Sequence, residues 1–438
     1  MGILLNPDNL SFKEAINSEI YRDKTMLIEL TNKVIQTKGK NICVSRPRRF
    51  GKSTTADMLT AYYSRGCDSK EIFDKYKICK TKNFSIHLNK YNVIHINMAR
   101  FIRTSGTIEA EIDKLSKRLL FELHQDNPDV DCFAPDDLID VLDDIFAQKK
   151  IPFIFIIDEW DCIFRMHKDD NTAHIFYLDF LRNLLKDQSY VALAYMTGIL
   201  PIKKYGEHSA LNMFTEISIA EADAYAEFTG FTETDVKDLC SEYDMPFDEI
   251  KRWYDGYNVN SISIYNPKSV VEAMIRHRIG NYWTKTETFE ALADHIKLDY
   301  KNLHSMVTQL IAGEEIRINT AKFQNDMTSF DTADDILTLL IHLGYLTFRH
   351  ESETHIGYGY VTIPNAEVRQ EFINCIESDD GWANVMNAIK ESDELLQEVL
   401  DGNTEAVAKD IEKCHEDNTS ILKYNDENKR HKCVIEKI

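Results

Sequence analysis

The stretch that decides the fold runs Asn41-Ile-Cys-Val-Ser-Arg-Pro-Arg-Arg-Phe-Gly-Lys-Ser-Thr54. Its apolar start predicts a short strand, 41–44, and the residues after a tight turn predict a helix that opens at Gly51-Lys-Ser53. Backbone N–H groups of such a turn and of the helix N-terminus converge on one hollow, where the helix dipole favours an anion. The pattern therefore indicates a phosphate-binding loop, with a basic surface turn as the alternative.

The loop matches the second half of the Walker A pattern G-x-x-x-x-G-K-[ST], because Arg46 stands at the first glycine position. In this pattern the lysine, here Lys52, reaches the β- and γ-phosphates of ATP, and the hydroxyl of Ser53 binds Mg²⁺. The candidate ATP-binding residues are Arg48, Arg49, Phe50, Gly51, Lys52, Ser53 and Thr54. Gly-Lys-Ser alone is a weak signal, and the flanking strand and helix strengthen it.

A second stretch, Ile151-Pro-Phe-Ile-Phe-Ile-Ile-Asp-Glu159, is a short apolar run that ends in two carboxylates. Such a run predicts a Walker B strand, 151–157, buried on both faces of a parallel sheet, where ligands bind at the carboxyl ends of the strands. We expect Asp158 to hold Mg²⁺ through water. We expect Glu159 to orient and deprotonate the water that attacks the γ-phosphate. An ordinary strand with a solvated Asp-Glu turn is the alternative.

Strands and helices alternate through the first half of the chain. The expected strands are 41–44, 92–98, 151–157, 190–196 and 214–219, and the expected helices between them are 54–63, 107–124, 135–148 and 171–186. This alternation predicts an α/β P-loop NTPase with a three-layer parallel sheet and an extra strand between the phosphate loop and the acidic strand. Thr197 ends the strand after the acidic one, where a γ-phosphate sensor would act in catalysis. A strand-terminating Thr-Gly turn explains Thr197 equally well.

The later part of the chain changes character, and the sequence predicts four regions. Helix 332–343, capped by Gly344 and followed by two strands around a turn, is typical of the end of a winged helix. The regions are an AAA-like P-loop ATPase domain over 1–225, a helical subdomain over 226–300, a winged-helix-like region over 301–375, and an acidic helical tail over 376–438.

Composition limits the classes of function. The 438 residues carry a net charge of −21, which counts against a surface that binds nucleic acid throughout. A basic patch of Arg46, Arg48, Arg49 and Lys52 is nevertheless expected at the loop.

The nine cysteines are odd in number and contain no C-x-x-C pair, which favours a reducing cytoplasm. No apolar run approaches the roughly 20 residues of a membrane helix, so no membrane partner is expected.

Taken together, the motifs resemble those of bacterial AAA-ATPase-like proteins, which often carry a C-terminal PD-(D/E)XK nuclease domain. The resemblance rests on Tyr21-Arg-Asp-Lys-Thr25, Ser45-Arg-Pro-Arg-Arg-Phe-Gly-Lys-Ser53, Ile157-Asp-Glu-Trp-Asp161, Thr197-Gly198, Trp253-Tyr-Asp-Gly-Tyr257, Tyr265-Asn-Pro267 and Ile363-Pro-Asn365. It implies that Lys52 and Ser53 bind phosphate and Mg²⁺, that Asp158 binds Mg²⁺, and that Glu159 is the base. The family usually has Tyr where Trp160 stands. Ring ATPases also use an arginine finger, for which Arg165 and Arg182 are candidates by position.

The sequence thus predicts an ATP-binding and ATP-hydrolysing protein that couples its nucleotide state to a partner. A nucleotide-gated scaffold with little turnover is one alternative, and a DNA-interaction module of a mobile-element or defence system is another. A protein partner and self-assembly both stay open. Residues 420–427 resemble the lead-in to the family's nuclease domain, and the short segment after them has no room for such a domain. We therefore expect no nuclease activity from this chain.

Overall fold

The computed structural model describes residues 2–102, 106–202, 211–220, 223–259, 262–283, 302–323, 330–352, 355, 357–377, 398–399, 402–404 and 407–409. The chain divides into two compact units. Unit 1 comprises Met1–Thr286 and Tyr300–Arg369, and unit 2 comprises Glu287–Asp299 and Gln370–Ile438. The elements discussed below lie in unit 1, apart from helix α16 (Ala366–Glu377), which enters unit 2 at Gln370.

Five parallel strands form the central sheet. They are β1 (Asn41–Ser45), β2 (Asn92–Asn97), β3 (Phe153–Asp158), β4 (Val191–Gly198) and β5 (Thr215–Ile217). Their order across the sheet is β2-β3-β4-β1-β5, so β4 lies between the strand that precedes the loop and the acidic strand. This confirms the fold class predicted from the sequence, an α/β P-loop NTPase sheet. The strand that comes between the loop and the acidic strand along the chain, β2, lies at the edge of the sheet, whereas β4 lies between them in space.

The register of the sheet brings the polar strand ends together. Val44 of β1 pairs with Thr197 of β4, and Asn97 of β2 pairs with Asp158 of β3. Because all these strands run in the same direction, their carboxyl ends meet at one edge of the sheet. The edge that carries Asp158 is also the edge at which the loop after β1 begins.

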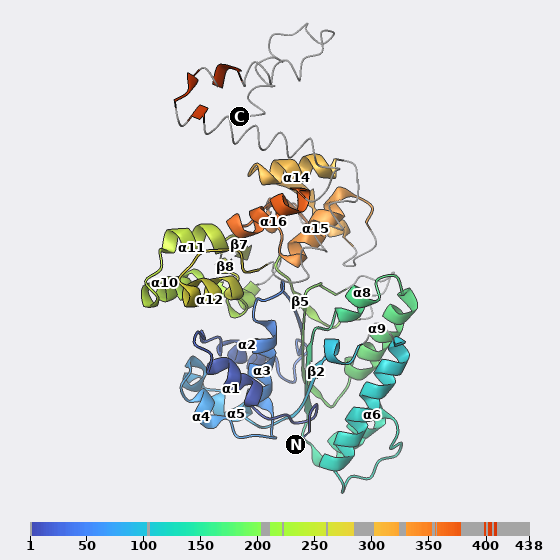
Figure 1. Ribbon diagram of the computed structural model, residues 1–438. Helices are drawn as coiled ribbons and strands as arrows, with labels where there is room; N and C mark the ends of the chain where they lie inside the picture. The colour runs from blue at the N-terminus through green and yellow to red at the C-terminus, as the bar shows by residue number, and fades with distance from the viewer. Residues whose placement is uncertain are drawn as a thin grey trace. The chain divides into compact units, whose positions relative to one another are not determined.

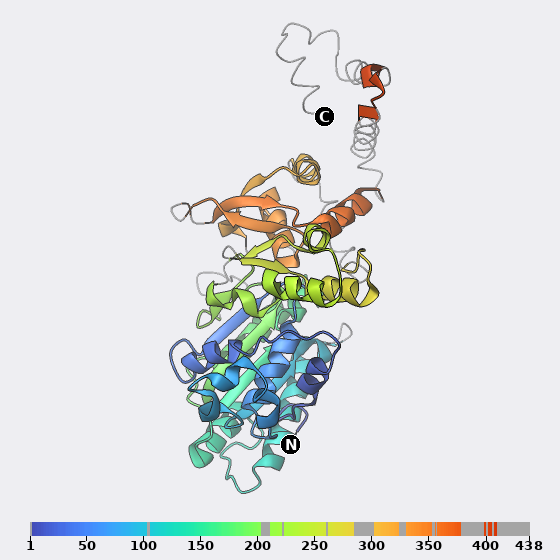
Figure 2. The same cartoon turned by 90° about the vertical axis from the view of Figure 1, so that its left-hand side faces the viewer.

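Helices cover both faces of the sheet and make three layers (Figure 1). One face carries α1 (Leu10–Ile16), α2 (Leu27–Val34), α3 (Lys52–Tyr63), α4 (Lys70–Phe73) and α5 (Phe84–His87). The other face carries α6 (Ile108–Asp126), α7 (Leu138–Lys149), α8 (Cys162–Met166) and α9 (Asn171–Leu185). Short 3-10 turns are η1 (Lys77–Lys80) and η2 (Met98–Arg100). Figure 2 views the α1–α5 layer from the front, with the strands behind it.

The core lies between these layers. All residues of β1, β3 and β4 are buried, as expected for strands covered on both faces. Apolar side chains of β3 join those of α6, α7 and α9 in one large cluster. On α9 the buried Leu178, Leu181 and Leu185 recur at helical spacing, which explains why the periodicity of the sequence predicted this helix well.

A second, smaller sheet follows the central one. The sequence predicts only helices between 226 and 300, but the structure adds three antiparallel strands in the order β6-β8-β7. They are β6 (Phe231–Thr232), β7 (Tyr257–Val259) and β8 (Ile262–Tyr265), and around them lie η3 (Asp223–Phe228), α10 (Glu233–Glu242), α11 (Phe247–Tyr254) and α12 (Pro267–Arg276). Strands of two to four residues are too short to show a period of two in the sequence. Asn266 precedes Pro267 at the start of α12, and the Asn266 side chain caps this helix.

A third sheet has the strand order β10-β11-β9. Its region holds α14 (Leu303–Ile311), β9 (Ile316–Asn319), η4 (Thr320–Lys322), α15 (Ala333–Leu343), β10 (Thr347–His350) and β11 (Tyr358–Thr362). The helix, the Gly344 cap and the β10–β11 hairpin are those expected from the sequence, whereas β9 was not predicted. β9 pairs antiparallel with β11, the second strand of the hairpin, and the winged-helix-like character of this region stays a prediction. The predicted tail, 376–438, lies almost wholly outside the described residues.

The family motifs of the later region meet at one junction. Gly256 adopts a left-handed φ of +108° and lies against the backbone of Pro364. The Asn365 side chain donates to the backbone oxygen of Asp255 at 2.8 Å, and the Tyr257 hydroxyl donates to the backbone oxygen of Gly344 at 2.7 Å. These contacts join the second sheet to the third, so the motifs have a packing role.

None of the described helices is both long and apolar enough to cross a membrane.

We predict that Gly256→Ala strongly destabilises the protein. A Cβ at this position would lie 1.9 Å from the backbone oxygen of Pro364, and the left-handed backbone adds strain. Gly313 is a matched control, because its φ is +91° but a Cβ there meets open space. Gly313→Ala should lower the free energy of unfolding by about 1–2 kcal/mol, and Gly256→Ala by about 1–3 kcal/mol more. Urea denaturation measures both, and equal losses would contradict the close packing at the junction.

Candidate phosphate-binding site

The loop after β1 has the shape that its sequence suggested. Arg49 and Gly51 take left-handed φ values of +69° and +83°, which turns the chain sharply before α3 begins at Lys52. The ammonium of Lys52 bends back over the loop and donates to the backbone oxygens of Arg46 at 3.0 Å and Pro47 at 2.9 Å. Burial lowers the pKa of Lys52, while the carboxylates Glu159, Asp161 and Asp158 oppose this effect.

Asp158 is the centre of the site. It is buried at the end of β3, and its carboxylate oxygens accept hydrogen bonds from three side chains. Ser53 Oγ donates to Oδ2 at 2.7 Å, Asn97 Nδ2 donates to Oδ2 at 3.2 Å, and Thr197 Oγ1 donates to Oδ1. These donors come from α3, β2 and β4, so the structure brings the predicted residues Ser53, Asp158 and Thr197 together.

Glu159 adjoins this centre but has a partner of its own. Its backbone is left-handed, with a φ of +54°, and its N–H donates to Asp158 Oδ1 at 3.0 Å. Its carboxylate accepts a hydrogen bond from the guanidinium of Arg165, which also lies 3.3 Å from Asp161 Oδ2. Arg165 is therefore held within its own chain. Arg182, the other arginine considered as a finger, pairs with Asp179 on the surface of α9.

The predicted basic patch at the loop is not an exposed patch. Arg46 and Lys52 are buried, and Arg48 and Arg49 are half-buried with partners of their own. The guanidinium of Arg46 donates through NH1 to the backbone oxygens of Ser45 at 2.9 Å and Ile217 at 3.1 Å. Burial lowers the pKa of Arg46 to about 10. Arg46 thus fastens the loop to the end of β5, which the count of positive charges could not reveal.

The other predicted loop residues are placed as follows. Phe50 is buried, and its ring meets the Tyr257 ring edge-on with centroids 5.0 Å apart. The backbone oxygen of Phe50 accepts a hydrogen bond from Gly230 N at 2.9 Å. Thr54 is half-buried in the first turn of α3. The side chain of Phe50 therefore serves the packing of the loop against the second sheet.

Two further polar residues lie near the site. Asp57 on α3 and His95 on β2 approach to 4.0 Å, and His95 Nδ1 also lies 3.2 Å from Thr60 Oγ1. Burial raises the pKa of Asp57 to about 7, and the charges of Asp158 and Glu14 contribute. Burial also lowers the pKa of His95.

Sequence reasoning missed Asn97, although a signal was present. Asn97 ends the strand beside the acidic one, and parallel strands end at a common edge. The pairing of Glu159 with Arg165 joins residues six apart through a turn and a short helix, and no sequence pattern indicates it.

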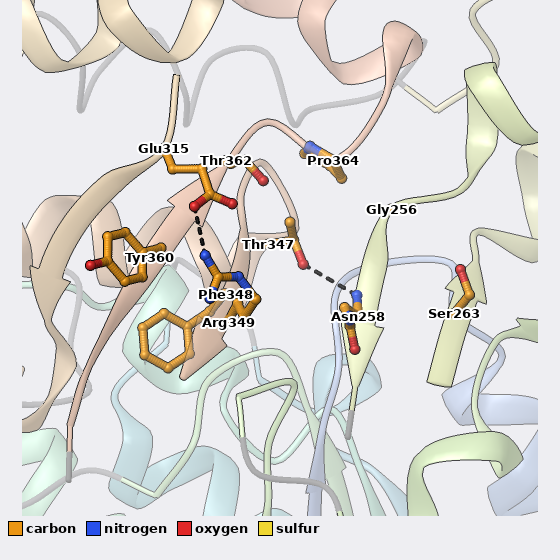
Figure 3. Close-up of a pocket in the computed structure, with 10 residues that line it drawn as sticks. All are labelled: Gly256, Asn258, Ser263, Glu315, Thr347, Phe348, Arg349, Tyr360, Thr362 and Pro364. Carbon is orange, nitrogen blue, oxygen red and sulfur yellow. Dashed lines mark hydrogen bonds and ion pairs between the residues drawn. The ribbon is translucent and has the colours of Figure 1, made fainter. Parts of the chain in front are cut away.

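A separate cavity of about 290 Å³ lies between the edges of the second and third sheets (Figure 3). In it Arg349 forms an ion pair with Glu315 at 2.6 Å, and Asn258 N donates to Thr347 Oγ1 at 3.2 Å. The cavity shares no residue with the predicted phosphate site, and its charged side chains neutralise each other.

The sheet order, the lysine-serine turn after β1 and the buried carboxylate after β3 define a nucleotide-binding P-loop protein. Residues 10–206 match the model of the AAA-ATPase-like family, described as predicted AAA-ATPase. This match confirms the resemblance found in the sequence.

One curated relative is the uncharacterized protein in the vnfD 5′ region of Azotobacter chroococcum mcd 1. It is 24% identical over 346 residues, which cover 76% of this chain, and the chain spans 62% of that relative's length.

Similar solved structures include ORC2 of Aeropyrum pernix in ADPNP-ADP complexes and Cdc6p from Pyrobaculum aerophilum. Their TM-scores are 0.34 and 0.31; each is 10% identical, and each comparison covers 86% of this chain and 99% of the other. The S. cerevisiae Hsp104-ADP complex has a TM-score of 0.30 and 14% identity over 99% of this chain and 50% of the other. Because these TM-scores are low, no property of those proteins is assigned to this chain.

We predict that Asp57→Asn changes the pH dependence of stability. Because the folded state raises the pKa of Asp57 to about 7, the group's stabilising contribution is complete below about pH 4 and is lost as pH rises through 7. The asparagine variant does not lose stability in this way, because its side chain does not titrate. Its free energy of unfolding should therefore gain on the wild type by on the order of 2–4 kcal/mol between pH 4 and 8. Urea denaturation without Mg²⁺ measures it, and a constant difference would contradict the burial of Asp57.

Proposed function

We propose that this protein binds ATP and Mg²⁺ at the loop after β1 and hydrolyses the ATP. The observation that carries the proposal is the meeting of Ser53, Asn97 and Thr197 on the buried carboxylate of Asp158, next to the Lys52 ammonium. A lysine, a hydroxyl and a carboxylate at the start of a helix and the end of a parallel strand suit the phosphates and the cation of a nucleotide.

The donor atoms fit Mg²⁺. Ser53 and Asp158 offer a hydroxyl and a carboxylate, the hard oxygen donors that this ion takes together with water and phosphate oxygens. The Ser53 hydroxyl oxygen and the Asp158 carboxylate oxygen lie 2.7 Å apart, so that one ion could contact both. When bound there, the ion would neutralise charge on the phosphates. We propose Ser53 and Asp158 as its protein ligands.

Each remaining residue has a proposed role. Lys52 would exchange its bonds to two loop carbonyls for bonds to the β- and γ-phosphates, since both sets are oxygen acceptors. Glu159 would accept a proton from the attacking water. Thr197, whose hydroxyl contacts Asp158, would sense the γ-phosphate. The backbone of Arg48, Arg49, Phe50, Gly51 and Thr54 would surround the phosphates.

The second candidate function is a nucleotide-gated scaffold with little turnover. The pairing of Glu159 with Arg165 favours it, because a carboxylate held by a guanidinium is less able to take up a proton. Measured ATP affinity with negligible measured turnover would identify the scaffold.

A DNA-interaction module receives less support. In a winged helix the second or third helix enters the major groove, and here α15 is buried from Asp335 to His342. Its Leu339 belongs to the same apolar cluster as the central sheet. Duplex binding that weakens steeply with salt would nevertheless revive this candidate.

A series of contacts connects the phosphate-binding loop with the second sheet and with the cap of α15. Phe50 of the loop touches Tyr257, whose hydroxyl bonds the Gly344 cap of α15, and Gly344 lies close to Pro47 of the same loop. We propose that a shift of the loop moves this junction, and that a protein partner or a second copy of the chain reads the movement.

We predict that Lys52→Ala lowers ATP affinity more than tenfold while the protein stays folded. The variant loses a charge-assisted contact with phosphate, worth about 1.5–3 kcal/mol. Calorimetry measures the affinity, and Lys33→Ala, which removes an exposed lysine on α2, is the control. Unchanged ATP binding by Lys52→Ala would rule out the proposed site.

We also predict that Glu159→Gln binds ATP normally and hydrolyses it about 10²-fold more slowly or worse, because the amide cannot take up the proton. Phosphate release measures turnover, and Glu249→Gln on the exposed face of α11 is the control. Turnover equal to that of the wild type would assign the base to another residue.

A further inference from the structure

The proposed mechanism gives no role to Arg165, although this residue lies next to the proposed site. It lies on the short helix α8, its side chain is only 15% exposed, and its guanidinium contacts the carboxylates of Glu159 and Asp161. Both contacts are within the chain and next to the proposed reaction site. We propose that Arg165 is a positioning residue that restrains Glu159, so that this ion pair keeps the basal rate of ATP hydrolysis low. The inference rests on the proposed ATPase function.

The restraint is anchored in the fold. Asp161 is fully buried, and its Oδ2 accepts hydrogen bonds from Ile199 N at 3.1 Å and Leu200 N at 2.9 Å. These amides belong to the two residues that directly follow β4, the strand that carries Thr197. Asp161 therefore cannot shift without breaking backbone hydrogen bonds, and the arginine that pairs with it is held on the same support. Glu159 is thus tied to the segment after β4.

The chemistry of the pair explains why it would slow hydrolysis. A guanidinium donates strong, charge-assisted hydrogen bonds to a carboxylate and partly neutralises it. Burial alone would lower the pKa of Arg165, but Asp161, Glu159 and Cys162 together raise it above its ordinary value, so the arginine stays charged. To accept a proton from water, Glu159 must give up this partner. The cost of separating the pair is added to the barrier of the reaction.

The same geometry argues against Arg165 as a finger for a neighbouring subunit. A finger must reach out of its own chain to another subunit's γ-phosphate. The Arg165 side chain is largely buried and engaged by two carboxylates of its own chain. Its influence on Lys52 is also exerted within one chain, because its charge acts to lower the pKa of that ammonium.

The test compares steady-state ATP hydrolysis and ATP affinity in the full chain for wild type, Arg165→Gln and Arg165→Lys. We expect Arg165→Gln to raise kcat about tenfold because the restraint on Glu159 is lost, and to leave ATP affinity nearly unchanged because no contact of Arg165 with the nucleotide is proposed. Arg165→Lys keeps the charge but loses the planar fork, and should give an intermediate kcat. Arg276→Gln, which breaks an exposed helical ion pair with Glu272, is the matched control and should leave both quantities unchanged.

A folded Arg165→Gln variant whose kcat equals or falls below that of the wild type would overturn the proposal. If Arg165→Gln does not fold, the test rests on Arg165→Lys. A kcat of Arg165→Lys no higher than that of the wild type would then overturn the proposal. The double variant Arg165→Gln with Glu159→Gln should lose the increase, because the effect acts through Glu159. Failure of the ATPase proposal is distinguishable, since it would appear as absent ATP binding by the wild type or as insensitivity of turnover to Glu159→Gln alone.

Discussion

The buried carboxylate of Asp158 is the interaction on which the rest of the site depends. A buried charge is costly unless hydrogen bonds satisfy it, and here the donors come from separate elements. Ser53 lies on α3, Asn97 on β2 and Thr197 on β4, and each donates to this one group. The carboxylate therefore fixes the start of α3 relative to the sheet edge. The parallel register makes this possible, because it places Asn97 beside Asp158 and ends all the strands together.

The loop is held from its other side by packing. Arg46, which replaces the first glycine of the phosphate-binding pattern, bonds the backbone at the end of β5, while Phe50 and Pro47 meet Tyr257 and Gly344. A glycine at position 46 would remove the first of these attachments. The family motifs around Tyr257 and Pro364 lie at the same junction. The side chains of these residues thus pack against one another, and they give the loop contacts with both later sheets.

Local pattern explains why much of the fold was predictable. Apolar runs and short stretches that mix apolar with polar residues, four to seven residues long, indicated the five strands of the central sheet, and helical spacing indicated α3, α6, α7 and α9. The edge rule for parallel sheets then brought Ser53, Asp158 and Thr197 to one place. The strands β6, β7, β8 and β9 were missed because two to four residues carry too little pattern, and they are specified by the partners with which they pair.

The sequence by itself determined the class of fold, the loop and the carboxylate that faces it, because these depend on short-range pattern and on a general property of parallel sheets. Only the tertiary structure decided the state of the charged side chains. Arg46 and Lys52 are buried although their composition suggested an exposed patch, and Arg165 pairs with Glu159 although its position suggested a finger. The burial of α15 likewise depends on neighbours distant in the chain. Burial and ion pairing depend on which elements pack against each other in the folded chain, and the spacing of residues along the sequence does not determine this packing.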